Sequence, residues 1–89
     1  MNVSISVFVV AKYYNKSYVG KCTDIDDGEC YVTFMEKYGE GYRWPSRPDK
    51  IWIGLDNVVM KLRPLFPKGR TRLFFRMCNE DRNAVSRLE

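Results

Sequence analysis

The residues in this chain best suited to chemistry are aromatic. Six tyrosines, five phenylalanines and two tryptophans make up 15% of its 89 residues. A domain of this size buries roughly 60–65% of the surface of its unfolded chain, so the rings that do not fit in the core are candidates for a recognition surface. The electronegative face of an aromatic ring attracts a cation, and each face contributes roughly 0.5–2 kcal/mol. The aromatic content therefore predicts a recognition surface formed by rings outside the core.

Catalytic chemistry has no matching set of residues in this sequence. The chain contains no histidine, the side chain that most often acts as a general base near neutral pH. The cysteines Cys22, Cys30 and Cys78 show no CxxC spacing, so neither a zinc site nor a disulfide scaffold is predicted. Reduced, buried thiols are the expected state and suit an intracellular protein, with a Cys22–Cys30 bridge across a hairpin as the alternative. We expect a binding module, not an enzyme, and no cofactor.

Positive charge is concentrated in the last third of the chain. Residues 1–60 contain seven Lys or Arg and eight Asp or Glu, whereas residues 61–89 contain eight and three. Arginine interleaved with phenylalanine is suited to pairing with phosphates and stacking on bases, so DNA or RNA binding is an alternative function. Its candidate residues are Lys61, Arg63, Lys68, Arg70, Arg72 and Arg76. In the other interpretation, the arginines are the solvated face of an edge strand, where charge prevents aggregation.

Short strands separated by turn residues predict an all-β fold for the first two-thirds of the chain. Strands are expected at 7–12, 18–25, 30–36, 51–53 and 58–62. Asp26-Asp27-Gly28 predicts a tight hairpin turn, because aspartate tolerates turn geometry and glycine adopts positive φ at little cost. Residues 38–49 hold two glycines and two prolines, which predict a long loop. Five short strands close most economically into a small barrel.

The chain beyond Leu62 is expected to be a basic C-terminal extension. Thr71–Met77 is a candidate extra strand, which either adds to the barrel or pairs with a second copy of the chain. Asn79 is a candidate N-cap for a short helix over residues 80–88, with a frayed tail as the alternative. The predicted division is a barrel at 5–62 and an extension at 63–89.

The start of the chain is interpreted as a strand. No apolar run approaches the roughly 18 residues that cross a bilayer. Met1 to Ala11 is apolar but lacks the basic segment and the small-residue cleavage site of a signal peptide. We therefore expect no membrane partner.

The order of landmarks in residues 7–62 resembles a Tudor domain. In chain order the landmarks are Tyr13-Tyr14, Tyr18-Val19-Gly20-Lys21, Tyr31-Val32-Thr33-Phe34, Tyr38-Gly39 and Gly54-Leu55-Asp56-Asn57-Val58-Val59. The first is an aromatic pair that ends the first strand, and the second is the start of the second strand. The third is the third strand, and the fourth follows it directly. The fifth is a helical turn that leads into the last strand. The resemblance covers about two-thirds of the chain. It implies a small five-stranded SH3-like barrel of the Tudor type.

The resemblance also implies an aromatic cage. In a Tudor-like barrel the loops after the first and third strands lie at the same end, where aromatic faces bind a methylated ammonium group that has lost part of its hydration. The candidate cage residues are Tyr13, Tyr14, Tyr18, Phe34 and Tyr38. Phe34 shares a strand face with Val32, and Tyr18 is suited to close the barrel mouth, so a core role is the alternative for both.

The two tryptophans are interpreted as packing residues. Trp52 lies between Ile51 and Ile53 and therefore points to the opposite face of its strand. Trp44 and Pro45 are expected to fold over it. An uncovered Trp52 would instead mark a partner surface.

These observations predict a non-enzymatic module that recognises a methylated lysine or arginine peptide, such as a histone tail, in a chromatin or RNA-associated setting. A nuclear location follows from that function. Two alternatives remain: nucleic-acid binding through the basic segment, and a structural module that self-associates through Thr71–Met77.

Overall fold

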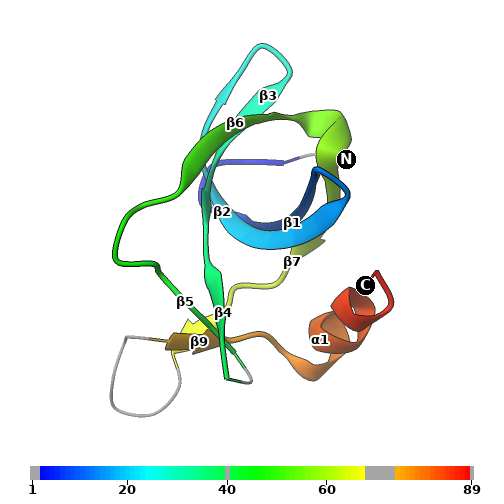
Figure 1. Cartoon of the computed structure of the whole chain (residues 1–89). Coiled ribbons are helices and arrows are strands. Elements are labelled where there is room, and N and C mark those ends of the chain that lie inside the picture. Colours follow the sequence, from blue (N-terminus) through cyan, green and yellow to red (C-terminus); the bar gives the residue numbers. More distant parts are fainter. Residues whose placement is uncertain (1–2, 40, 68–73, 89) are drawn as a thin grey trace.

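The computed structural model describes residues 3–39, 41–67 and 74–88, which form mostly β-structure. The elements are β1 (Phe8–Tyr13), β2 (Lys16–Asp26), β3 (Glu29–Phe34), β4 (Glu36–Tyr38), β5 (Gly41–Arg43), β6 (Lys50–Gly54), the 3₁₀ turn η1 (Leu55–Asn57), β7 (Val58–Leu62), β8 (Phe66–Pro67), β9 (Phe74–Arg76) and α1 (Asn79–Ser86). The strands form two antiparallel sheets, ordered β6-β3-β2-β1-β7 and β4-β5-β9-β8. Helix α1 lies at the same end of the molecule as the second sheet (Figure 1).

The first sheet is strongly curved, and its five strands bend around a common centre (Figure 1). Irregularities in register, between Val10 and Ala11 and between Cys22 and Asp24, increase this bend. Strands β6 and β7 are its edges, and within the described residues no ladder joins them. The all-β prediction is confirmed, and so is the Asp27-Gly28 turn, where both residues have positive φ. The expected closure into a barrel is not observed. The turn η1 connects β6 to β7 along the chain, but the two edge strands do not form a ladder with each other in the described residues.

Strand β1 separates two hydrophobic cores. The concave core, inside the curve of the first sheet, consists of Val9, Ala11, Cys22, Cys30, Val32, Phe34, Ile53 and Val58. The interlayer core, between the first sheet and the C-terminal elements, consists of Phe8, Val10, Val19, Met35, Leu62, Leu65, Met77 and Val85. Side chains alternate along a strand, so Phe8 and Val10 enter one core while Val9 and Ala11 enter the other. All four are buried.

The second sheet contains a hairpin in a segment that was expected to be a loop. Strands β4 and β5 pair with each other, and β5 also pairs with β9. Gly39 has a φ of 59° in the connecting turn, and a Cβ on Gly41 would overlap the Phe75 carbonyl oxygen. The two glycines thus permit a turn and a close strand approach. The expected loop at 38–49 is wrong over its first half for this reason.

The C-terminal segment, expected as an extension, packs on the rest of the chain. Strand β9 lies between β5 and β8, so both of its edges are paired within this chain. The part of the expected strand at 71–73, like Lys68 and Arg70, lies outside the described residues. Within β9, Phe75 pairs with both β5 and β8, Phe74 with β5 and Arg76 with β8.

Helix α1 is held by a buried carboxylate. Asp81, which is 6% exposed, accepts hydrogen bonds from the backbone N–H of Arg63 at 2.7 Å and from its Nη1 at 3.1 Å. Arg63 Nη2 also lies 3.0 Å from Glu80. The short helix is confirmed, but its N-cap residue is Cys78, and Asn79 is already helical. Among the described residues, α1 and η1 are too short to cross a membrane.

The tryptophans occupy different surroundings from those expected. Trp44 packs in the interlayer core, with its ring centroid 6.4 Å from Phe8 and 6.3 Å from Phe75. Trp52 instead stacks on Tyr31 at 5.0 Å and remains 41% exposed. The expectation that Trp44 covers Trp52 is wrong, because the C-terminal elements give Trp44 a larger apolar surface to join.

The thiols provide a test of this packing. Cys22 and Cys30 are free and fully buried, and desolvation raises the pKa of each thiol. Cys78 is only partly buried. Because the thiolate is the reactive form, we expect an aromatic disulfide reagent to modify Cys78 first, and Cys22 and Cys30 roughly 100-fold or more slowly. Reaction kinetics with and without denaturant measure this, and a fast phase that persists in Cys78→Ser would contradict it.

Candidate functional site

A cavity of about 290 Å³ opens at one end of the first sheet. It is lined by Tyr13, Tyr18, Phe34, Asp49, Lys50 and Ile51, and we call it the aromatic cavity. The rings of Tyr18 and Phe34 lie 5.6 Å apart at 60°. Phe34 is 5% exposed, whereas Tyr13 and Tyr18 are 37% and 38% exposed. Phe34 is therefore the buried side of the cavity, and the two tyrosines form its accessible walls.

Gly20 allows the rings of Tyr18 and Phe34 to meet. Gly20 lies two residues after Tyr18 in β2, on the same face, and pairs with Phe34 of β3. A Cβ on Gly20 would lie 3.1 Å from Cδ1 of Phe34 and closer still to Val32. The missing side chain thus gives the Phe34 ring room to lie over β2 beside Tyr18. Phe34 belongs to the concave core as well, so it is both a core residue and part of the cavity lining.

The β1–β2 turn presents a second pair of rings. Tyr14 and Asn15 have φ values of 51° and 63° and connect two paired strands, the geometry of a two-residue hairpin turn. Positive φ is unfavourable for tyrosine, and such backbone strain often occurs at binding sites. Tyr14 is 84% exposed, and its ring lies 4.4 Å from that of Tyr13. Tyr14 therefore flanks the cavity from outside and supports the ring that lines it.

A carboxylate and an ammonium group lie beside the rings. The backbone N–H of Phe34 donates to the carbonyl oxygen of Asp49 at 2.8 Å, which holds the segment before β6 against the end of β3. The pKa of the Tyr13 hydroxyl is raised, first by its hydrogen bond with Tyr14 and then by desolvation and the nearby negative charges of Tyr14 and Asp49. The sequence interpretation missed Asp49 and Lys50. Their position directly before the expected strand at 51–53 was the sequence signal that could have placed them at the end of the sheet.

Tyr38 does not line the aromatic cavity. It lies in β4, where its ring is 5.7 Å from Phe74 and the Arg43 guanidinium carbon is 4.3 Å from its centroid. Its expected position was wrong because the chain leaves the first sheet after β3 and forms the β4–β5 hairpin. Of the five candidate cage residues, the structure brings Tyr13, Tyr18 and Phe34 around one cavity, with Tyr14 next to Tyr13.

The basic residues proposed for nucleic-acid binding are in unequal surroundings. Lys61 is exposed on β7, and Arg76 is half-buried in β9. Arg63 is bound by Glu80 and Asp81, so much of its charge is already matched. Lys68, Arg70 and Arg72 lie outside the described residues.

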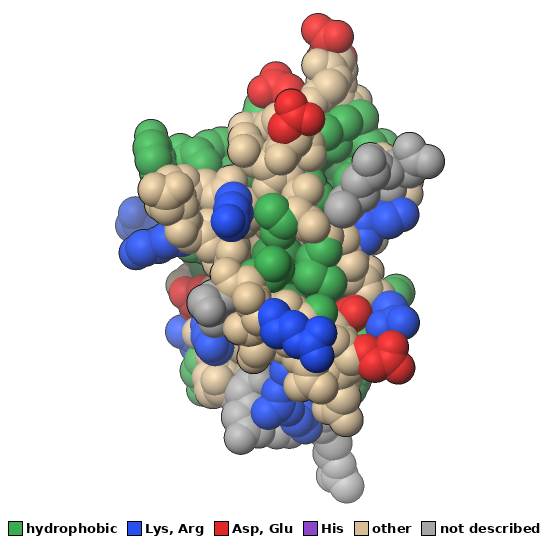
Figure 2. All heavy atoms as spheres, turned by 90° about the vertical axis from the view of Figure 1, so that its right-hand side faces the viewer, with side chains coloured by type: hydrophobic (Ala, Val, Ile, Leu, Met, Phe, Trp, Pro, Cys, Tyr) green, Lys and Arg blue, Asp and Glu red, His purple; other side chains and the backbone are tan. Residues whose placement is uncertain are grey.

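A group of acidic side chains lies at one tip of the molecule. The exposed residues Asp26, Asp27 and Glu29 lie at the tip of the β2–β3 hairpin. Figure 2 shows acidic side chains at this end and lysine and arginine side chains across the middle and lower part of the same face. The negative tip therefore lies away from the second sheet and α1.

Comparison of the chain with protein-family models, curated proteins and solved structures finds no match. Within the described residues, no three or more Cys, Asp or Glu side chains gather in a group able to hold a metal ion. The arrangement of rings and charges at the aromatic cavity is therefore the basis for a functional proposal.

The titration of Tyr13 tests the geometry of this site. Since the Tyr14 hydrogen bond is the largest cause of its raised pKa, we expect Tyr14→Phe to lower the pKa of Tyr13 toward its ordinary value. Asp49→Asn should lower it less. Nuclear magnetic resonance of tyrosine-labelled protein measures both values, with Tyr31→Phe as a control outside the cavity. An unchanged Tyr13 pKa in Tyr14→Phe would contradict the contact.

Proposed function

We propose that this chain is a Tudor-like module with an SH3-like barrel fold that binds a peptide carrying a methylated lysine or arginine. The fold part is supported by the strand order of the first sheet, in which β7 and β6 flank the β1–β3 meander and η1 connects them. This is the order of landmarks on which the Tudor resemblance depends. All five strands also contribute to the concave core, as expected of a barrel-like sheet.

The ligand class rests on one observation: three aromatic residues line a single cavity, together with Asp49 and Lys50. A methylated ammonium group keeps its charge but binds water weakly, so it enters an aromatic site at a lower desolvation cost than an unmodified lysine. The ring faces and Asp49 then supply the electrostatic attraction. Two accessible rings contribute roughly 1–4 kcal/mol, and peptide contacts add to this. Affinities around tens of micromolar follow.

The setting we propose is chromatin or RNA-associated, with a nuclear location and a methylated histone or similar tail as partner. The net charge of +4 favours association with the nucleic acid of such assemblies. Non-covalent recognition, without catalysis, is the proposed activity.

Tyr18 and Tyr38 form a matched pair for testing this function. Both are partly exposed strand tyrosines, 38% and 46% exposed, but only Tyr18 lines the aromatic cavity. On an array of methylated and unmethylated peptides, we expect binding that depends on methylation. Tyr18→Ala should weaken that binding about tenfold or more, because a ring face is lost. Tyr38→Ala should change it less than about twofold, because its ring packs in the second sheet.

Two further variants complete this test. Phe34→Ala is unsuitable, because Phe34 is buried and its loss would destabilise the fold by roughly 3–5 kcal/mol. Trp52→Ala removes an exposed ring outside the cavity and should leave binding unchanged. Equal binding of methylated and unmethylated peptides by the wild type would refute the proposal, as would an equal effect of Tyr18→Ala and Trp52→Ala.

Asp49 and Lys50 should have opposite effects on the affinity for a cationic ligand. Both line the cavity and are exposed, so each interaction with a bound cation is worth roughly 0.3–1 kcal/mol. We expect Asp49→Asn to weaken binding of the methylated peptide about two- to fivefold, and Lys50→Gln to strengthen it by a similar factor. Titration calorimetry at two salt concentrations measures both effects, which should shrink at higher salt. Changes of the same sign would show that the two charges do not face the ligand.

A further inference from the structure

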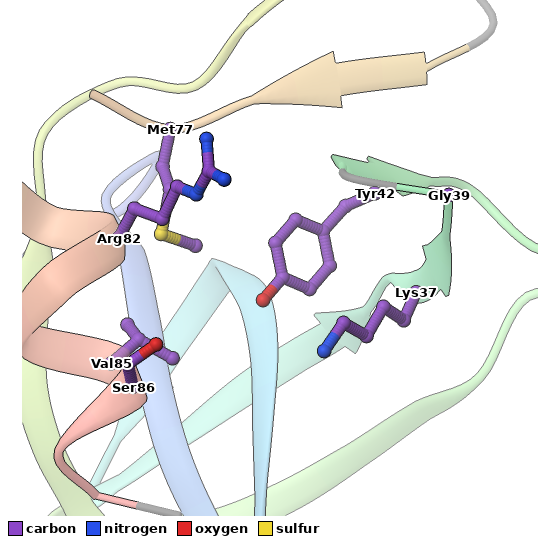
Figure 3. Close-up of a pocket in the computed structure, with 7 residues that line it drawn as sticks. All are labelled: Lys37, Gly39, Tyr42, Met77, Arg82, Val85 and Ser86. Carbon is purple, nitrogen blue, oxygen red and sulfur yellow. The ribbon is translucent and has the colours of Figure 1, made fainter. Parts of the chain in front are cut away.

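A second cavity, of about 260 Å³, lies between α1 and the β4–β5 hairpin. It is lined by Lys37, Gly39, Tyr42, Met77, Arg82, Val85 and Ser86, and we call it the helix cavity. In Figure 3 the Arg82 side chain extends from α1 toward the hairpin, and the ring of Tyr42 projects from β5 toward the helix. Lys37 extends from β4 with its ammonium group near the cavity. Two cationic groups thus approach the same space from opposite sides.

These two cations are not matched by acidic groups. No described residue that lines the cavity is acidic, and neither Lys37 nor Arg82 forms an ion pair with a described residue. Two other described arginines are paired: Arg43 with Glu36, and Arg63 with Glu80 and Asp81. The described residues that line the helix cavity therefore carry a formal charge of about +2.

The fold holds the two cations in place from both sides. Asp81 is fixed to Arg63, which sets the rotation of α1 and directs its neighbour Arg82 toward the hairpin. Val85, three residues later, anchors the same helix face in the interlayer core. On the other side, Lys37 pairs directly with Tyr42 across the β4–β5 ladder. The backbone positions of Lys37 and Arg82 are thus fixed by a strand ladder and a docked helix, while both side chains are exposed to a ligand.

A third, smaller cavity lies between the helix cavity and the aromatic cavity and shares lining residues with each. Lys37, Tyr42 and Val85 also line a smaller cavity of about 80 Å³, and this smaller cavity includes Ser17 and Tyr18. Tyr18 in turn lines the aromatic cavity. One extended peptide lying along this line would therefore contact both the ring faces and the two cations.

We propose that the helix cavity binds a phosphorylated serine or threonine side chain of the same peptide whose methylated residue occupies the aromatic cavity. A phosphoryl group carries a charge of about −1.5 to −2 at neutral pH, which matches Lys37 and Arg82 together, whereas a carboxylate matches only one. Arginine and lysine both bind phosphate oxygens strongly. The choice of peptide rests on the proposed function, but the phosphoryl site depends only on the residues of the helix cavity.

The first experiment examines the phosphoryl site alone, with free phosphoserine and serine as probes. In nuclear magnetic resonance titrations, we expect phosphoserine to shift the amides of β4 and α1 and the Arg82 side-chain N–H, and serine to shift none. The effect should disappear in Lys37→Gln and Arg82→Gln, and weaken with salt. Arg87→Gln, an exposed arginine at the end of the same helix, is the matched control and should retain it. Shifts that persist in Arg82→Gln, or disappear in Arg87→Gln, would overturn the site.

The second experiment links the two cavities. Peptide libraries carry a fixed trimethyllysine or lysine, and phosphoserine, glutamate or serine at successive positions from it. We expect one range of spacings in which phosphoserine tightens binding about tenfold over serine, and more than glutamate does. This gain should vanish in Arg82→Gln and survive in Arg87→Gln. Absence of a gain at every spacing would overturn the linkage.

The outcomes separate the two proposals. Methylation-dependent binding without any phosphoserine effect would refute this inference and leave the proposed function intact. A phosphoserine effect that depends on Arg82 but not on methylation would support the phosphoryl site and refute the proposed function. Single-stranded RNA that shifts the same Arg82 and Lys37 signals more strongly than the best phosphopeptide would replace a peptide ligand by a nucleic acid.

Discussion

The structure depends on the burial of β1 from both sides. Four consecutive side chains, Phe8 to Ala11, are buried, and their alternation feeds two separate cores. The strand also has hydrogen-bonded neighbours on both edges, β2 and β7. The residues that position the aromatic cavity and the helix cavity lie in this strand or pack against it. Tyr13 ends β1, Tyr18 pairs with its Ala11, and Val10 lies in the core that also holds Val85 of α1.

Features governed by local chemistry were predictable from the sequence. The apolar run at the start indicated β1, and Asp27-Gly28 indicated the β2–β3 turn, since both signals depend on neighbouring residues only. Tyr13, Tyr18 and Phe34 were correctly expected near one another, because their strands are consecutive in the chain and pair as a meander. The expected cysteine environment also followed from composition, and Cys22 and Cys30 are buried and free.

Features that depend on distant partners were not predictable. Gly39 and Gly41 indicated a loop, whereas one serves a hairpin turn and the other the approach of Phe75, about 30 residues later. Without β9, nothing in the segment after β3 distinguishes a hairpin from a loop, so Tyr38 and Trp44 were assigned to the wrong surroundings. The placement of Arg82 and Lys37 around one cavity has the same origin, because the two residues line it only after α1 docks.

The pairing of β5 with β9 has a consequence for biosynthesis. The hydrogen-bonded ladders of the curved sheet include no residue beyond β7, so its strands are all available once Leu62 has left the ribosome. The β4–β5 hairpin, in contrast, is translated early and receives its neighbouring strand only when residues 74–76 emerge. Until then the β4–β5 hairpin lacks the strand that pairs with β5, since contacts of long sequence separation form late. Nascent chains of intermediate length would therefore display the tyrosine-walled end before the basic end has taken shape.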